Sequence, residues 1–282
     1  MGTYPSTSRF NQILGEFKAA FIKDVRVFLR YPSWVASEFI TTPLWFVFFA
    51  LGVYLYSTPG KFSQTVGNAG TLTFFYWGFI FLIIFSTSIW GIGQYIRTEQ
   101  LQGTIEQLFL APVSRVTIIF GRFLRTFFTD MIFIGYTAGL ITFFSHETVP
   151  IVNPLLFIPV FAFLELGVLG FGLLFAGVAF RVKSFNLLAN LTQFAIIGIC
   201  GLFFPVTVLP HPVSLLSLMI PFTYFTDLLR YTSTGCNGCT IFEPSLEVPL
   251  AFLSAIALFF LGLGFFKIVE ASAQKRGTIG TH

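Results

Sequence analysis

Three acidic residues, Glu38, Asp130 and Glu165, stand inside long apolar stretches of the sequence. If these stretches lie in lipid, each ionised side chain costs about 2.5 to 3.5 kcal/mol at the centre of a helix. Asp130 and Glu165 lie deep in their stretches, so we expect each to pair with a neighbouring helix or to line a wet cavity. Glu38 lies near the start of its stretch and close to Arg30, where we expect a structural role. A proton relay is the alternative role for Asp130 and Glu165, although no intramembrane His or chain of basic residues completes one.

The cysteines form one motif, Cys236-Asn237-Gly238-Cys239. A single C-x-x-C lacks the second ligand pair of a structural zinc site, so we predict no metal site. A disulfide between Cys236 and Cys239, across the Asn-Gly turn, is the chemistry that this spacing allows in an oxidising exterior. The third cysteine, Cys200, is predicted to pack as a small apolar side chain.

The sequence contains no G-x-x-x-x-G-K-[ST] motif, because the Gly-Lys pair at residues 60 and 61 is followed by Phe62 and not by Ser or Thr. We therefore do not expect the chain to bind ATP by a phosphate loop. The glycines of residues 167–172 form G-x-x-G-x-G, but without the strand and helix of a dinucleotide site, so we predict that they serve helix packing. The G-x-x-x-G of residues 135–139 also permits close helix approach. We predict no catalytic residue and no cofactor on this chain.

The elements that hold these residues must be membrane helices. Hydrophobic residues make up 55% of the 282 residues, charged residues make up 10%, and the mean hydropathy is +0.82. This composition excludes a soluble protein. Because a spanning helix needs about 20 apolar residues, the chain can hold about six spans, with no room for a catalytic soluble domain.

The predicted fold is an all-α membrane protein with six transmembrane helices. A further apolar segment, residues 211–222, lies between two Pro-containing turns and is about half a span long, which suits a re-entrant or interfacial piece. Residues of about 209–246 therefore form the predicted re-entrant and outer segment before the last span. The six predicted spans cover about residues 34–56, 71–94, 116–144, 154–180, 187–208 and 248–268.

The N-terminal segment has the period of an amphipathic helix. Between residues 10 and 29, apolar side chains recur at helical spacing, with Lys18, Lys23 and Arg26 between them. Because a span follows directly, we predict an interfacial helix on the membrane surface. A cytosolic amphipathic helix packed on a partner is the alternative.

The predicted domains are a cytoplasmic tail with this helix at 1–32, the six-helix transmembrane domain at 33–270 and a cytoplasmic tail at 271–282.

The basic residues predict the orientation in the membrane. If the N-terminus is cytoplasmic, all of the 16 Lys and Arg residues except Lys61 and Arg230 lie in inside regions. Cytoplasmic loops carry an excess of Lys and Arg. Both termini and residues 97–115 are therefore predicted to face the cytoplasm.

Residues 97–115 form a short polar-to-amphipathic segment between the second and third spans. Thr104 and Gln107 have the spacing of a capping box, so we expect a helix to begin there. An apolar stripe follows at helical spacing, and Pro112 ends the helix. A short amphipathic helix between spans either rests on the lipid surface or docks into another protein.

These motifs resemble those of one family, the type-2 ABC exporter permeases. The family's cytoplasmic coupling-helix region is similar to residues 99–115, E-Q-L-Q-G-T-I-E-Q-L-F-L-A-P-V-S-R, in which a Gly-Thr-aliphatic-Glu core precedes a Pro-Val-Ser-Arg turn. The family's extracellular re-entrant region is similar to L-F-F-P-V-T-V-L-P at 202–210 and I-P-F-T-Y-F-T-D-L-L-R at 220–230, although Ile220 stands where Asn is usual. The resemblance covers nearly the whole chain.

The resemblance implies a transporter subunit that is not itself an enzyme. The implied partners are two copies of a separate ABC ATPase subunit, which carry ATP and Mg, and a second permease copy in a homodimer; we expect no nucleic acid. The resemblance places the coupling helix at about residues 97–112. The residues implied to couple to the ATPase are Glu99, Gln100, Gly103, Thr104, Ile105, Glu106, Gln107, Leu108 and Phe109.

The resemblance also implies that the first, second and fifth spans border the translocation route at the dimer axis. An aromatic lining suits an amphipathic or apolar cargo, and short loops with few intramembrane charges favour a hydrophobic drug-like molecule or a lipid. Export from the cytoplasm or inner leaflet across the plasma membrane is implied. The aromatic residues that are candidates for this lining are Trp45, Phe46, Phe49, Phe75, Phe79, Phe194 and Phe203.

Other functions stay open at this point. Related permeases move lipid-linked glycans or polysaccharides. An ATP-independent secondary carrier is a second alternative, although the two halves of the sequence show no repeat of the kind that such carriers have. An integral-membrane enzyme is disfavoured, because no cluster of His, Cys or carboxylates gathers at either membrane face.

Overall fold

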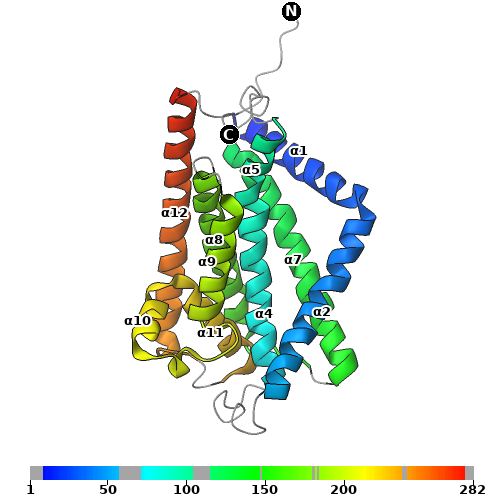
Figure 1. Ribbon diagram of the computed structural model, residues 1–282, viewed down its shortest axis with the longest axis vertical. Coiled ribbons are helices and arrows are strands. Elements are labelled where there is room, and N and C mark those ends of the chain that lie inside the picture. Colours follow the sequence, from blue (N-terminus) through cyan, green and yellow to red (C-terminus); the bar gives the residue numbers. More distant parts are fainter. Residues whose placement is uncertain are drawn as a thin grey trace, which may run out of the picture.

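The structure, a computed structural model, describes residues 9–56, 71–103, 115–146, 148–179, 182, 184–236 and 240–276. In these residues the chain forms helices joined by short turns, without any strand (Figure 1). The predicted all-helical fold class is therefore confirmed for this part of the chain. The helices are α1 (Arg9–Arg30), α2 (Pro32–Tyr56), α4 (Thr71–Thr87), η1 (Ser88–Gly93), α5 (Gln94–Leu101), α7 (Arg115–Ser145), α8 (Pro154–Ala179), α9 (Phe185–Ile199), η2 (Val206–Val208), α10 (His211–Met219), α11 (Pro221–Thr234) and α12 (Pro244–Arg276).

Four of the described helices are long and apolar enough to cross a membrane, or five if α10 and α11 are one broken span. The predicted count of six spans is thus matched only in part. α2 contributes a shorter apolar stretch, Val35–Phe48, and α9 contributes Phe185–Ile199. The four long helices are Thr71–Leu101, Val116–Phe144, Pro154–Ala179 and Pro244–Lys275.

The predicted fifth span, residues 187–208, is not one helix. α9 ends at Ile199, and Gly201 has a φ of +67°, a left-handed conformation that glycine adopts readily. The chain then passes through turns and η2 before α10 begins. The 15 residues of α9 rise by about 22 Å, which is less than the roughly 30 Å of a bilayer core.

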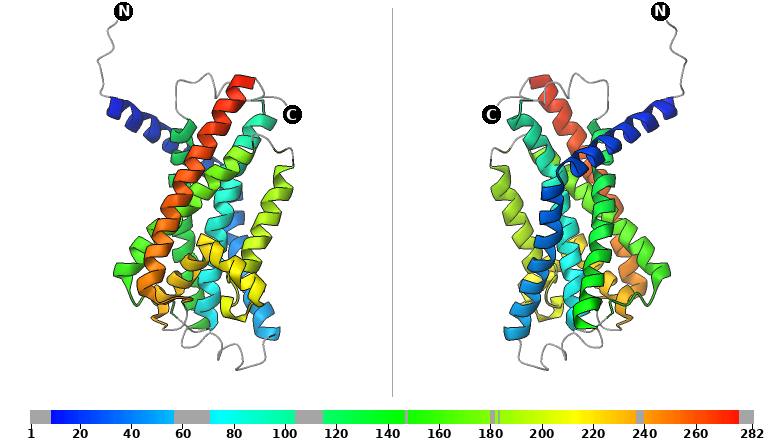
Figure 2. Two further views of the ribbon diagram at one scale, coloured as in Figure 1. Left: turned by 90° about the vertical axis from the view of Figure 1, so that its left-hand side faces the viewer. Right: turned by 90° about the vertical axis from the view of Figure 1, so that its right-hand side faces the viewer.

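The helices form an upright bundle with two distinct ends. α1, α5 and the C-terminal part of α12 lie at one end, which we call the α5 end, whereas α10 and α11 lie at the other, the α10 end (Figures 1 and 2). α4, η1 and α5 form one continuous rod along the bundle. Within this rod η1 is a π-helix, a wider turn that is rare and often found at functional sites.

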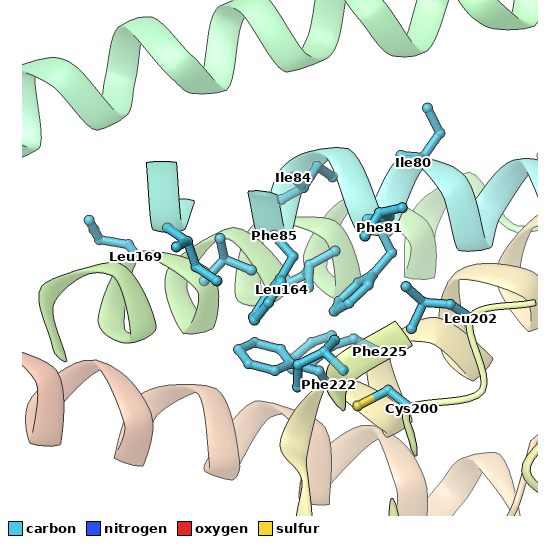
Figure 3. Packing of buried hydrophobic residues seen from close by; sticks show 14 of the residues in the cluster. Ile80, Phe81, Ile84, Phe85, Leu164, Leu169, Cys200, Leu202, Phe222 and Phe225 are labelled. Carbon is cyan, nitrogen blue, oxygen red and sulfur yellow. The ribbon is translucent and has the colours of Figure 1, made fainter. Parts of the chain in front are cut away.

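Aromatic side chains fill the core between the α4 rod, α8 and α11. Phe81 and Phe85 of α4 point toward Phe222 and Phe225 of α11, with Leu164 of α8 beside them (Figure 3). The rings of Phe85 and Phe222 meet edge to face at 5.2 Å between centroids. Such pairs add about 0.5 to 1.5 kcal/mol each beyond the area that they bury.

α8 and α12 approach each other through glycine. A Cβ added to Gly262 would lie 2.0 Å from the carbonyl oxygen of Gly170, so the two backbones are in direct contact there. This agrees with the packing role predicted for the glycines of residues 167–172. By contrast, a Cβ added to Gly135 or Gly139 would meet nothing within 4 Å in the described residues.

α1 packs on α7 through the second half of its apolar stripe. The ring of Phe21 lies 6.0 Å from that of Phe128, and the Arg125 guanidinium lies 5.3 Å above the ring of Phe28. Lys18, Lys23 and Arg26 of the same helix are exposed. The predicted amphipathic helix is present, and part of its apolar face contacts α7 of the same chain; a position on the membrane surface stays a prediction.

Arg230 ties the α10 end together. Its side chain is fully buried in α11 and forms an ion pair with Asp227 at 3.6 Å. Its guanidinium donates to the carbonyl oxygens of Phe74, Gly201 and Leu202, which belong to α4 and to the turn after α9. α11 meets α10 at a bend of 89°. Asp227 and Arg230 therefore fix the bent helix pair to α4.

Candidate functional site

A cavity of about 580 Å³ lies between α2, the α4 rod, α7 and α9. Its volume is in the range of sites that hold small organic ligands. Aromatic and aliphatic side chains cover much of its wall, and a polar strip runs along α7. The lining residues are Glu38, Thr42, Trp45, Phe79, Leu82, Ile83, Ser86, Thr87, Trp90, Gly91, Arg122, Arg125, Thr126, Thr129, Asp130, Phe133, Gln193, Phe194 and Ile197.

Asp130 is the most deeply buried charged residue of this wall, with 2% of its surface exposed. Thr87, the last residue of α4, donates its hydroxyl to Asp130 Oδ2 at 3.0 Å. Asp130 Oδ1 is buried and has no hydrogen-bond partner among the described residues. A buried carboxylate oxygen without a donor is costly, so a ligand that reaches Asp130 from the cavity would gain a hydrogen bond there.

Two arginines share the wall with the carboxylates. Arg125 interacts electrostatically with both Glu38 of α2 and Asp130, and therefore links the acidic residues of two helices. Arg122 lies one turn nearer the α5 end, with its guanidinium 4.6 Å above the ring of Tyr95. In the described part of the chain its Nε is buried without an acceptor. The cavity wall thus holds a buried donor and a buried acceptor that lack partners there.

A hydrogen-bond chain joins α9 to the α4 rod at the edge of the cavity. Trp90 Nε1 donates to Gln193 Oε1 at 3.0 Å, and Gln193 Nε2 donates to the Ser86 hydroxyl at 2.8 Å. The wider turn of η1 places Trp90 toward α9 while Ser88 donates to the Val168 carbonyl of α8 at 2.6 Å. One helix segment therefore serves both the cavity wall and the core.

The structure separates the aromatic residues predicted to line a substrate route. Trp45, Phe79 and Phe194, from α2, α4 and α9, line the cavity together. Phe46 is 6% exposed and packs on Phe79 at 5.2 Å between ring centroids. The remaining residues of that set lie elsewhere: Phe75 is buried against Phe203, and the Phe49 side chain lies outside the described residues.

Of the three predicted intramembrane charges, two meet at the cavity. Glu38 and Asp130 line its wall, whereas Glu165 is not among the lining residues. Glu165 is buried on α8, with its Oε1 unpartnered, and interacts electrostatically with Asp130. The two carboxyl groups therefore lie close enough to influence each other, although only Asp130 lines the cavity.

Only the first part of the predicted coupling segment is described. Residues up to Leu101 continue the α4 rod as α5, and Gly103 follows in a left-handed conformation with a φ of +68°. Gln100 is buried and accepts a hydrogen bond from Arg97 at 3.3 Å. The helix predicted to begin at Thr104 lies outside the described residues, as do the coupling candidates Thr104, Ile105, Glu106, Gln107, Leu108 and Phe109.

Cys236 is disulfide-bonded, whereas Cys200 is a buried free thiol. Cys239 lies outside the described residues, so its pairing with Cys236 stays a prediction.

Sequence reasoning missed several polar residues of the site. Arg122 and Arg125 were assigned to an inside region by their charge alone, but they line the cavity from within α7. Thr87 belongs to the polar run Ser86-Thr87-Ser88 and Gln193 follows Thr192, so short polar runs inside apolar sequence were the available signal. Arg230 was expected in an outer region, whereas the structure buries it completely.

The model of a family described as ABC-2 family transporter protein matches residues 39–266. A search of curated proteins finds no significant match.

Proposed function

The chain belongs to the ABC-2 family of transporter proteins, and we propose that it is the permease subunit of an ATP-driven exporter for hydrophobic or amphipathic molecules. The family implies a multi-pass membrane subunit that works with an ABC ATPase. ATP and Mg are then bound on the ATPase partner, of which we propose two copies, beside a second permease copy.

The observation that carries the substrate class is the cavity of about 580 Å³. It combines aromatic rings from α2, the α4 rod, α7 and α9 with a partly buried polar strip, and such walls suit a molecule with an apolar body and a polar group. A drug-like molecule or a single lipid fits this chemistry better than a long glycan, which stays the alternative within the family.

The coupling to the ATPase is proposed for the segment after α5. α5 continues the α4 rod without a break, and that rod forms one wall of the cavity. A movement imposed on the segment at about 97–112 would therefore be transmitted directly to the cavity. The proposed orientation, with the α5 end in the cytoplasm, puts this segment where ATP is found.

A pull-down from native membranes in mild detergent tests the proposal. The wild-type chain is compared with one in which Gly103 to Phe109 is replaced by a flexible Gly/Ser segment. An ATPase with a phosphate-loop motif should co-purify with the first chain and be lost with the second. A well-folded wild-type chain that brings down no such ATPase would contradict the proposal.

A secondary carrier is the second candidate, favoured by the partnerless oxygens of Asp130 and Glu165. Such carboxylates in a membrane protein often belong to ion pathways. The carrier would move substrate in liposomes under an ion gradient without any ATPase. An Asp130→Asn or Glu165→Gln variant would then lose the gradient-driven transport.

A further inference from the structure

The charges along the cavity wall are arranged as a dipole. On α7, Arg122 lies toward the α5 end, and Asp130 follows eight residues later, about 12 Å along the helix axis. Between them, Arg125 and Glu38 compensate each other electrostatically. One end of the cavity is therefore positive and the other negative.

Both ends carry an unused hydrogen-bonding atom. Within the residues that the structure describes, Arg122 Nε is a buried donor without an acceptor, and Asp130 Oδ1 is a buried acceptor without a donor. Asp130 is 2% exposed, so water from outside does not reach it freely. A ligand whose only charged group is anionic pairs with Arg122 and is repelled by Asp130. A ligand whose only charged group is cationic pairs with Asp130 and is repelled by Arg122.

The four ionisable residues of the wall also sum to no net formal charge, since there are two arginines and two carboxylates. A ligand with a net charge would leave one charge of the ligand or of the wall without a partner, which is unfavourable inside a protein. A ligand that carries both charges adds none.

We propose that this cavity binds zwitterionic amphiphiles, with the anionic group toward Arg122, the cationic group toward Asp130 and the apolar part against the aromatic wall. The inference rests on the proposed export function, because it names the substrate class of the same site. Trp45 and Phe79 supply apolar and ring surface to the ligand body, and aromatic faces also attract organic cations.

Direct binding tests this without any ATPase. Two of the 4 tryptophans of the chain, Trp45 and Trp90, line the cavity, so bromine-labelled amphiphiles quench them on binding. The purified chain, in lipid discs of anionic phosphoglycerol lipid, is titrated with octyl phosphocholine, octyltrimethylammonium and octyl sulfate, each brominated on the alkyl chain. The zwitterion should bind about tenfold more tightly than either charged probe, the factor that about 1.4 kcal/mol gives. The quenching should be lost in W45F/W90F.

The variants should reverse the selectivity in opposite directions. Asp130→Asn removes the negative end, so octyl sulfate should become the preferred probe; Arg122→Gln removes the positive end, so octyltrimethylammonium should be preferred. Asp130→Glu and Arg122→Lys keep the charges and should retain the preference for the zwitterion. Thr142→Val, an exposed position of α7 outside the cavity lining, is the uncharged control. Equal binding of the three probes, or an equal loss of all three in both charge variants, overturns the proposal.

The same measurement shows whether the zwitterionic ligand comes from the bilayer, as a lipid, or from solution, as a soluble amphiphile. In discs of phosphocholine lipid, a bilayer lipid that enters the cavity would weaken the apparent affinity of octyl phosphocholine. An unchanged affinity indicates that the cavity takes only soluble amphiphiles. A failure of this binding test leaves the ATPase pull-down unaffected, so the two proposals fail independently.

Discussion

At the scale of single residues, Arg230 has the most demanding surroundings. Its guanidinium lies 3.5 Å above the ring of Phe74, donates to three backbone carbonyls and pairs with Asp227, all inside the protein. A lysine could supply the charge but not the planar fork that reaches several acceptors at once. Arg230 therefore acts as a structural junction between α11, α4 and the turn after α9.

We expect Arg230→Gln to destabilise the protein by about 3 to 5 kcal/mol, because it leaves the Asp227 carboxylate buried without its partner. Arg230→Lys should be less damaging, since it keeps the charge. Thermal unfolding of the purified variants in detergent measures both effects. The control is Lys275→Gln at an exposed position of α12. If Arg230→Gln unfolds at the same temperature as this control, Arg230 is not a structural junction.

The sequence reveals some of these residues but not their neighbours. Asp130 and Glu38 are noticeable because they interrupt apolar sequence, and the cavity does contain them. Arg230 gives no such signal, since its burial depends on Gly78. A Cβ added to Gly78 would lie 1.7 Å from the Leu202 carbonyl oxygen, so only glycine lets that turn approach α4. Contacts between segments so far apart in the chain cannot be obtained from local periodicity.

At the scale of helices, periodicity predicts where helices exist better than where they end. α9 ends at Ile199, although the apolar run of residues 187–208 continues beyond it. The rest of the run lies in the turns between α9 and α10, so hydrophobicity alone does not mark the end of the helix. The π-helical turn of η1 has no signal in the hydrophobic pattern either. It is stabilised by tertiary contacts, such as the hydrogen bond from Ser88 to α8.

The contact between α8 and α12 offers a matched test within one helix. Gly262→Ala would place a methyl group 2.0 Å from the Gly170 carbonyl oxygen, and we expect a loss of about 1 to 3 kcal/mol from the strain. Gly264→Ala, two residues further along α12, would meet nothing within 4 Å. The higher helix propensity of alanine should leave that variant unchanged or stabilise it by up to about 1 kcal/mol. The two unfolding temperatures are compared in the same detergent, and equal losses would argue against a specific contact.

At the scale of the whole molecule, the two ends of the bundle differ in charge. α1 and the C-terminal part of α12 bring Lys18, Lys23, Arg26, Lys267 and Lys275 to the α5 end, whereas the described basic residue of the α10 end, Arg230, is buried. Basic residues favour the cytoplasmic side. The fold therefore gathers charges that are dispersed along the sequence at one end, and this supports an α5 end in the cytoplasm.

Cysteine labelling of intact cells tests this orientation. Ser245 lies exposed at the start of α12 and Lys275 lies exposed near its end, so one helix carries both reporters. Of the described native cysteines, Cys200 is buried and Cys236 is disulfide-bonded, so neither should react in the folded chain. A membrane-impermeant maleimide should label Ser245→Cys in intact cells, but Lys275→Cys only after permeabilisation. The unmodified chain is the background control. If the pattern is reversed, the α5 end faces outward, a cytoplasmic ATPase has no access to residues 97–112, and the ATP-driven mechanism proposed for this permease cannot operate through that segment.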